Sequence, residues 1–246
     1  MKKQAWQARL GLVLIFSTAA LYYMHYLIFK DSHHIFIYML GDIAFLPLEV
    51  LFVTLIIHEL LNLKEKRSRL QKLNMVIGAF FSEVGTHLLT LFSDYDPGLD
   101  EIRGKLIVKG DWSDNDFATV SSSLGEYQYD IDLSVADLPG MRSFLVGKRG
   151  FLLRMLQNPT LLEHDSFTEM LQAVFHLTEE LENRRDSTKL PESDLKHLQG
   201  DVKRAYERIV YEWLDYMRHL KLEYPYLFSL AMRTNPFDQD ASPVVE

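Results

Sequence analysis

The chain has 246 residues, a formal net charge of -8 at pH 7 and no cysteine. Nucleic acid is not an expected partner, because phosphate binding requires a basic patch, and the lack of cysteine is compatible with either redox compartment. The length is sufficient for one moderate domain and a membrane anchor.

Two apolar stretches near the N-terminus are long enough to cross a bilayer. Residues 10–29 carry no formal charge, and about 20 such residues span a hydrocarbon core. A second run extends from Ile35 to about Leu63, so we expect it to tilt or to continue beyond the membrane. A secretory signal peptide is the alternative at the N-terminus, but the apolar run continues past the small residues 17–20, which favours a retained span.

Basic residues flank the two spans. Lys2, Lys3 and Arg9 precede the first span, the stretch 64–72 follows the second, and the short outer connection holds only Lys30. Because positive charge stays on the cytoplasmic side, we predict a multi-pass inner-membrane protein with both termini in the cytoplasm. Nearly all of the remaining chain is then cytosolic.

The second span contains two carboxylates. Asp42 and Glu49 are seven residues apart, which places them within about 20° of each other on a helix. A carboxylate in hydrocarbon costs several kcal/mol unless it faces protein or water. Two helices cannot enclose water, so these positions predict a homo-oligomer in which Asp42 and Glu49 form acidic rings around a cation pathway. The permeant ion is open, with divalent cations among the candidates, and no cofactor is required.

Pro47 and His25 offer two different roles near these carboxylates. Pro47 frees the carbonyl of Ile43 and can bend or widen the helix near an outer mouth. Alternatively, His25 of the first span lies at a depth similar to that of Glu49 and could pair with it, without any pore. We therefore assign His25 and Pro47 to pairing or gating.

A short motif marks the inner end of the second span. His58 and Glu59 begin the pattern of a zinc metalloprotease helix, but Asn62 stands where the second histidine ligand is needed. We expect no enzyme activity from this motif. His58 and Glu59 are instead predicted to reach water at the inner interface, where they join the pairing or gating candidates.

The layout of residues 35–63 resembles that of mitochondrial calcium uniporters. Two spans with a short outer connection, acidic residues near a proline and a following helical stalk carry this likeness. Uniporters place a tryptophan and then Asp and Glu three apart ahead of the proline, whereas here no tryptophan precedes Asp42, and Pro47 comes before Glu49. The resemblance implies an analogous mechanism and not membership of that family.

The rest of the chain predicts a stalk and a cytosolic domain. Residues 64–93 continue as a helix, with apolar positions spaced three and four apart from Leu70 to Leu91. Gly78, Ser82 and Gly85 add a small-residue stripe that another helix could approach closely.

Residues 94–149 are predicted to form an acidic α+β insert. Within it we predict strands at 103–109 and 126–133 and a short helix that starts from a capping box at Ser113 and Asp116. If the strands are neighbours, lysines of the first could pair with aspartates of the second.

Residues 150–234 are predicted as a helical domain and 235–246 as a flexible tail. With the hairpin 1–63, the predicted fold is a mainly α membrane protein: two transmembrane helices followed by a cytosolic helical domain with a small α+β insert.

Histidines and carboxylates also recur along two predicted helices of the helical domain. Residues of these types are Glu169, His176, Glu179 and Glu180 on one helix and His197, Asp201, Asp215 and His219 on the next. Metal sites in helical bundles use such side chains, although the Glu-x-x-His order is missing. Two alternatives to the channel follow: a non-conducting membrane sensor or scaffold with a cytosolic partner-binding domain, and a metal-dependent enzyme.

Overall fold

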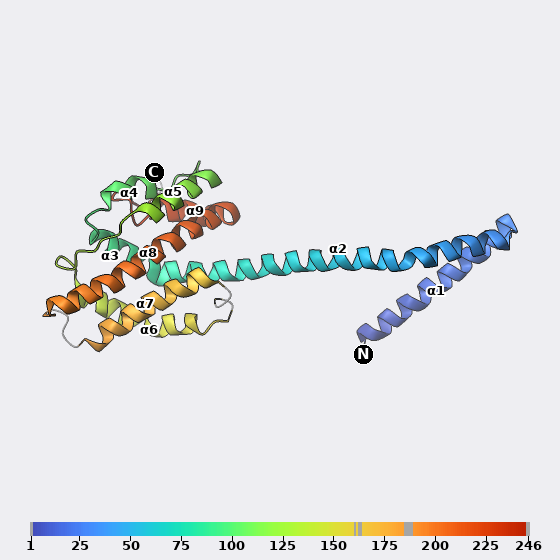
Figure 1. Cartoon of the computed structure of the whole chain (residues 1–246), viewed down its shortest axis with the longest axis horizontal. Coiled ribbons are helices and arrows are strands. Elements are labelled where there is room, and N and C mark those ends of the chain that lie inside the picture. Colours follow the sequence, from blue (N-terminus) through green and yellow to red (C-terminus); the bar gives the residue numbers. More distant parts are fainter. Residues whose placement is uncertain (1, 160, 162–163, 185–188, 245–246) are drawn as a thin grey trace. The chain divides into compact units, whose positions relative to one another are not determined.

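Every regular element in the part of the chain that the structure describes is helical (Figure 1). The computed structural model describes residues 2–159, 161, 164–184 and 189–244. The side chains of 2–5, 7–8 and 66–72 lie outside this description, so the predicted basic flanks at Lys2, Lys3 and 66–72 and the seam position Leu70 also fall outside it. The chain divides into two compact units, Met1–Lys66 and Arg67–Glu246.

The first unit is a helical hairpin. Helix α1 (Lys2–Phe29) is joined to α2 (Ser32–Phe80) through Lys30, whose φ of 48° is in the left-handed region. The Lys30 amide donates to the Tyr26 carbonyl at 2.8 Å, which caps α1. Asp31 accepts from the His34 amide at 3.1 Å and caps the start of α2. Two residues thus suffice to reverse the chain.

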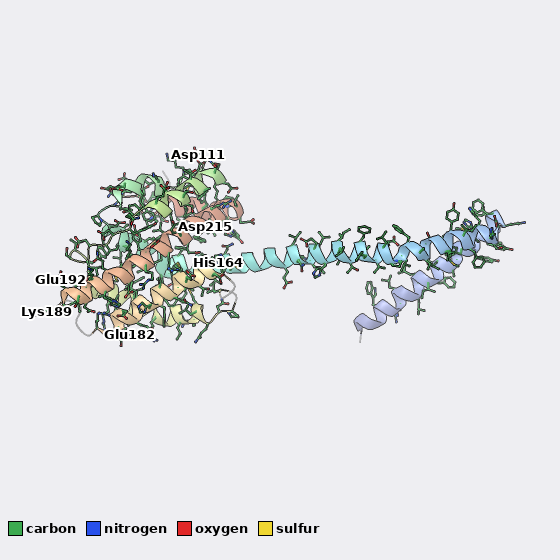
Figure 2. The ribbon with its side chains drawn as sticks, viewed as in Figure 1. Asp111, His164, Glu182, Lys189, Glu192 and Asp215 are labelled. Atoms are coloured by element: carbon green, nitrogen blue, oxygen red, sulfur yellow. The ribbon has the colours of Figure 1, made fainter. Side chains whose placement is uncertain are left out.

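The first unit exposes its apolar side chains. By length and composition, Arg9–Phe29 and Ser32–Glu65 are candidate membrane spans, and neither is buried within the protein. Figure 2 shows their side chains pointing outward from the ribbons. A third apolar helical stretch, Leu73–Asp94, is also long enough, but 44% of it is buried in the core of the second unit.

The second unit begins within α2, and its described residues form eight further helical segments. A π-helical segment, Phe81–Gly85, separates the end of α2 from α3. The following helices are α3 (Thr86–Asp94), α4 (Asp100–Leu106), α5 (Asp114–Glu126), α6 (Leu138–Leu156), α7 (Asp165–Asn183), α8 (Glu192–Glu223) and α9 (Pro225–Arg233).

Helix α8 is the centre of the second unit. It packs against α3, α5, α7, α9 and the π-helical segment, while α6 covers the other side of α7. Its buried face includes Tyr206, which makes edge contacts with Phe92 and Tyr129. Burying one large apolar side chain stabilises the fold by about 1.5–3 kcal/mol. The core is therefore built around the apolar spacing of α8.

Two local sequence predictions agree with the structure. The Ser113 hydroxyl accepts from the Asp116 amide, and the Asp116 carboxylate accepts from the Ser113 amide, so the predicted capping box of α5 is confirmed. At Gly78, a Cβ atom would lie 2.9 Å from the hydroxyl of Tyr216 on α8. This is the close helix approach expected at the small-residue stripe.

The predicted strand at 103–109 is wrong, because most of this segment belongs to α4. Asp100 and Glu101 occupy the first turn, and Arg103 and Lys105 the last. Both placements favour a helix, since they complement its dipole. The helix also buries Ile102 and Leu106, which are four residues apart.

The predicted strand at 126–133 is also wrong, although the side chains do alternate. Tyr129, Ile131 and Leu133 are buried, and the residues between them are exposed. The segment has no neighbouring strand in the described chain, and the Asp132 amide bonds instead to the Tyr95 carbonyl at 2.8 Å. The insert is therefore helical and irregular, and the predicted α+β fold class is corrected to an all-helical one.

Two predicted domain limits fall at unexpected places. The limit between residues 149 and 150 lies inside α6. The tail predicted from residue 235 begins in the core, because Asn235 and Phe237 are buried. The side-chain amide of Asn235 donates to the Leu106 carbonyl at 2.9 Å. This contact anchors the end of α9 to α4.

Candidate functional site

Asp42 and Glu49, the two carboxylates of the predicted second span, both lie on exposed positions of α2 within the first unit. Asp42 lines a pocket of about 280 Å³ near the hairpin connection. The other lining residues are Tyr22, His25, His34, Ile35 and Tyr38. Glu49 does not line this pocket, and among the described residues no hydrogen bond or ion pair reaches it.

The pocket brings His25 near Asp42 and not near Glu49. The His25 ring lies 4.7 Å from the Phe29 ring and 6.3 Å from the His34 ring, and its Nε2 atom is buried without a hydrogen-bond partner. The alternative pairing of His25 with Glu49 is therefore absent from the described hairpin. Two imidazoles and a carboxylate instead share the connection end.

The other predicted pairing or gating residues lie along α2. Pro47 is inside the helix and does not end it. His58 and Glu59 are exposed. The sequence placed these residues on one helix, and the structure does the same.

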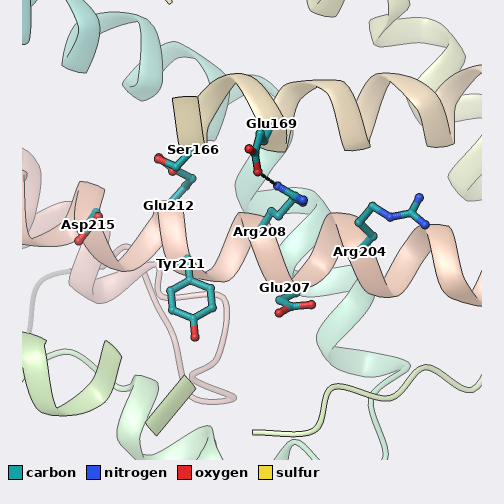
Figure 3. Close-up of a pocket in the computed structure, with 8 residues that line it drawn as sticks. All are labelled: Ser166, Glu169, Arg204, Glu207, Arg208, Tyr211, Glu212 and Asp215. Carbon is teal, nitrogen blue, oxygen red and sulfur yellow. Dashed lines mark hydrogen bonds and ion pairs between the residues drawn. The ribbon is translucent and has the colours of Figure 1, made fainter. Parts of the chain in front are cut away.

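The second unit has a polar pocket between α7 and α8 (Figure 3). Its volume is about 440 Å³, and its lining residues are Ser166, Glu169, Arg204, Glu207, Arg208, Tyr211, Glu212 and Asp215. Arg208 pairs with Glu169, as the dashed line marks. The lining combines four carboxyls with two guanidiniums, so the pocket suits a small polar ligand.

Glu212 is the buried member of this pocket. It is 5% exposed, and burial raises the pKa of its carboxyl, against a smaller lowering by a hydrogen bond with Ser166. A carboxyl that holds its proton closer to neutral pH can donate or accept a proton, which is a feature of functional sites. The sequence analysis missed Glu212, although it follows buried Ile209 by three residues and therefore shares its helical face.

The structure joins four of the histidines and carboxylates that the sequence placed on two helices. His176 and Glu180 on α7 meet His197 and Asp201 on α8. The remaining candidates lie apart from this group. Glu169 pairs with Arg208, Glu179 with Arg149, and His219 contacts Asn74, while Asp215 lines the pocket of Figure 3.

Comparison with known proteins identifies relatives for both parts of the chain. A family model described as the C-terminal helical domain of the uncharacterized protein MJ1433 matches residues 69–233, and one described as the N-terminal helical domain of MJ1433 matches residues 2–61. The uncharacterized protein MJ1433 of Methanocaldococcus jannaschii is 42% identical over 246 residues, covering 100% of this chain and 99% of that protein. No solved structure matches the chain. The chain belongs to the MJ1433 family.

Proposed function

We propose that the protein is a homo-oligomeric membrane protein in which the second span, part of α2, lines a cation pathway. One observation carries the proposal: Glu49 is exposed on an apolar helix and has no partner among the described residues of the hairpin. An ionised carboxylate on such a surface is costly in lipid. Water shared between copies of the chain would remove that cost.

The position of Asp42 supports the same arrangement. It lies seven residues before Glu49, so both carboxylates follow one stripe of α2. Successive acidic rings attract cations and allow them to leave. In the proposed orientation both termini are cytoplasmic, and the pocket that contains His25, His34 and Asp42 lies at the outer mouth. Divalent cations are candidate permeant ions.

Cation flux into liposomes tests this proposal. Purified full-length protein is expected to admit cations, and Glu49→Gln is expected to reduce the flux strongly, because it removes the negative ring. Glu126→Gln is the control, since this exposed carboxylate lies at the end of α5 in the second unit. A monomer in nanodiscs, or unchanged flux in Glu49→Gln, would reject the pathway.

A non-conducting membrane scaffold is the second candidate. An apolar groove of about 470 Å³ in the second unit favours it. The groove includes Met75, which is 63% exposed, and Tyr226, which is 72% exposed. Exposed apolar patches mark interaction surfaces. Absent flux, together with a bound partner that Met75→Ser and Tyr226→Ser release, would favour this candidate.

A further inference from the structure

Helices α7 and α8 each present a histidine and a carboxylate to the same place. His176 and Glu180 are four residues apart on α7, and His197 and Asp201 are four residues apart on α8. On a helix this spacing puts both side chains on one face. Because α7 and α8 lie side by side (Figure 1), the two pairs form one group, called here the His–carboxylate cluster.

His176, Glu180 and Asp201 each place one potential ligand atom within 4.8 Å of the other two. His197 Nε2 lies 3.3 Å from Asp201 Oδ2 and 3.6 Å from Glu180 Oε2. His176 Nε2 lies 3.6 Å from Asp201 Oδ1 and 3.8 Å from Glu180 Oε1. Ligands of tetrahedral zinc, at 2.0–2.1 Å from the ion, are about 3.3–3.4 Å apart. The ligand atoms of His176, Glu180 and Asp201 would have to move closer together to reach that spacing, and His197 contacts the other oxygen of each carboxylate.

Asp201 gives an independent sign of a missing partner. Its side chain is 3% exposed, and its Oδ2 atom is buried with no hydrogen-bond partner. His197 Nε2 is 3.3 Å from that atom but outside hydrogen-bond geometry. A buried carboxylate oxygen without a partner is costly. A cation between the two atoms would remove this cost.

Two arginines pair with the carboxylates and leave oxygen atoms for a ligand. Arg204 donates to Asp201 Oδ1 at 2.7 Å, and Arg184 donates to Glu180 Oε2 at 2.6 Å. Each arginine takes one oxygen of its carboxylate, so Asp201 Oδ2 and Glu180 Oε1 accept no hydrogen bond from the described residues. These oxygen atoms are donors suited to a metal.

The cluster is open to solvent on its histidine side. The side chains of His176 and His197 are 46% and 53% exposed, whereas Asp201 lies at the base. An ion can therefore reach the carboxylates past the two rings.

We propose that His176, Glu180 and Asp201 bind a divalent first-row transition metal ion, with zinc as the test ion and with His197, next to Asp201 Oδ2, able to join them. Imidazole and carboxylate ligands together suit zinc and its neighbours, whereas calcium and magnesium prefer oxygen ligands alone. The site closes α7 against α8 in the second unit. It does not depend on ion conduction by the first unit.

Zinc titration of the purified full-length protein, without an affinity tag, tests the site. The protein is first stripped with a chelator, then loaded with zinc and freed of unbound metal. Elemental analysis is then expected to find one zinc ion per chain, and competition with a chromophoric chelator gives the affinity. Excess calcium is expected not to displace the zinc. No retained zinc would overturn the proposal and leave the cluster as an ion-pair network.

Paired variants locate the site. Glu180→Gln is expected to weaken zinc binding at least about 10-fold, whereas Glu179→Gln, the adjacent residue that pairs with Arg149, is expected to leave it unchanged. His176→Gln is expected to act like Glu180→Gln, with exposed His87→Gln as its control.

The histidine variants guard against a folding artefact. His176 is half-exposed, so circular dichroism of His176→Gln should show an unchanged fold. A substitution of the buried Asp201 would not give the same assurance. Equal zinc affinity in wild type and in the double variant His176→Gln, His197→Gln would overturn the proposal. Flux without zinc binding would reject the metal site and keep the cation pathway.

Discussion

The two units contain similar apolar helices but use them in opposite ways. Arg9–Phe29 has a mean hydropathy of 1.7 and is 0% buried, whereas Leu73–Asp94 has a mean hydropathy of 1.5 and is 44% buried. The difference is the partner, because α8 packs against α3 and the π-helical segment within the second stretch. Hydropathy thus identifies helices whose apolar side chains need a partner other than water. The packing of the chain decides whether that partner is the protein's own core.

A core phenylalanine gives the largest expected contrast between the units. Phe80 is 0% exposed and makes edge contacts with Phe81 and Phe167. Phe80→Ala is expected to lower the free energy of unfolding of the second unit by about 3–5 kcal/mol, because it leaves a cavity. Denaturant unfolding in detergent measures the loss, followed by the fluorescence of buried Trp213 in a background in which Trp6 and Trp112 are replaced by Phe.

Phe16→Ala is the matched change in the first unit. Phe16 is 78% exposed on α1, so its removal leaves no cavity in the described protein and should not move the Trp213 transition. A loss comparable to that of Phe80→Ala would show that the side chains of α1 contribute to the core of the second unit. The proposed division of roles would then be wrong.

Glycine substitutions test the packing of Leu73–Asp94, the apolar stretch that is partly buried in the second unit. A Cβ atom on Gly85 would lie 2.6 Å from a ring carbon of Phe81 and 2.7 Å from one of Phe80. Gly85→Ala is therefore expected to destabilise the second unit by about 1–3 kcal/mol through overpacking. The same fluorescence transition measures this loss.

Gly147 on α6 provides the control for Gly85. A Cβ atom on Gly147 would have open space around it, and alanine is a better helix former, so Gly147→Ala is expected to stabilise by up to about 1 kcal/mol. Equal effects of the two changes would mean that helix propensity, and not the fit against Phe80 and Phe81, determines the outcome.

The sequence predicted local features well where the signal is itself local. The capping box at Ser113 depends on residues three apart. The predicted helical domain over 150–234 likewise contains α8, Glu192–Glu223, whose buried residues recur at helical spacing. The buried side chains of Tyr129, Ile131 and Leu133 alternate with exposed ones as in a strand, but alternation could not show that no strand lies alongside within the described chain. Pairing is a long-range property, and the α+β prediction failed for that reason.

The candidate sites divide in the same way. Spacing alone placed His176 with Glu180 and His197 with Asp201, but the helical period cannot show that these two faces meet. Asp201 carried a further signal, because it lies three residues after Leu198 and four before Ala205, both buried. The surroundings of Asp42 could not be predicted, since they depend on how the chain reverses at Lys30.

The smallest expected effect concerns the carboxyl of Glu212, which is buried in the second unit, whereas the carboxyl of Glu49 in the first unit is exposed. Burial raises the pKa of Glu212 in the folded state. Folding therefore favours the protonated carboxyl. Its contribution to the free energy of unfolding is fully present below the pKa of Glu212 in the unfolded chain, and it is lost as the pH rises through the higher pKa of the folded protein. Glu212→Gln, which stays neutral, is expected to be more stable than wild type at pH 7 by about 1 kcal/mol.

Unfolding measured between pH 4 and pH 8 checks this sign. The advantage of Glu212→Gln should shrink as the pH falls, because wild-type Glu212 then becomes neutral too. Exposed Glu207→Gln, from the rim of the same pocket, should show no such trend. The opposite result would be a Glu212→Gln variant that is less stable than wild type at pH 7 and gains stability relative to wild type on acidification. The ionised Glu212 carboxylate would then have a favourable partner in the pocket, and that partner would outweigh the cost of its burial.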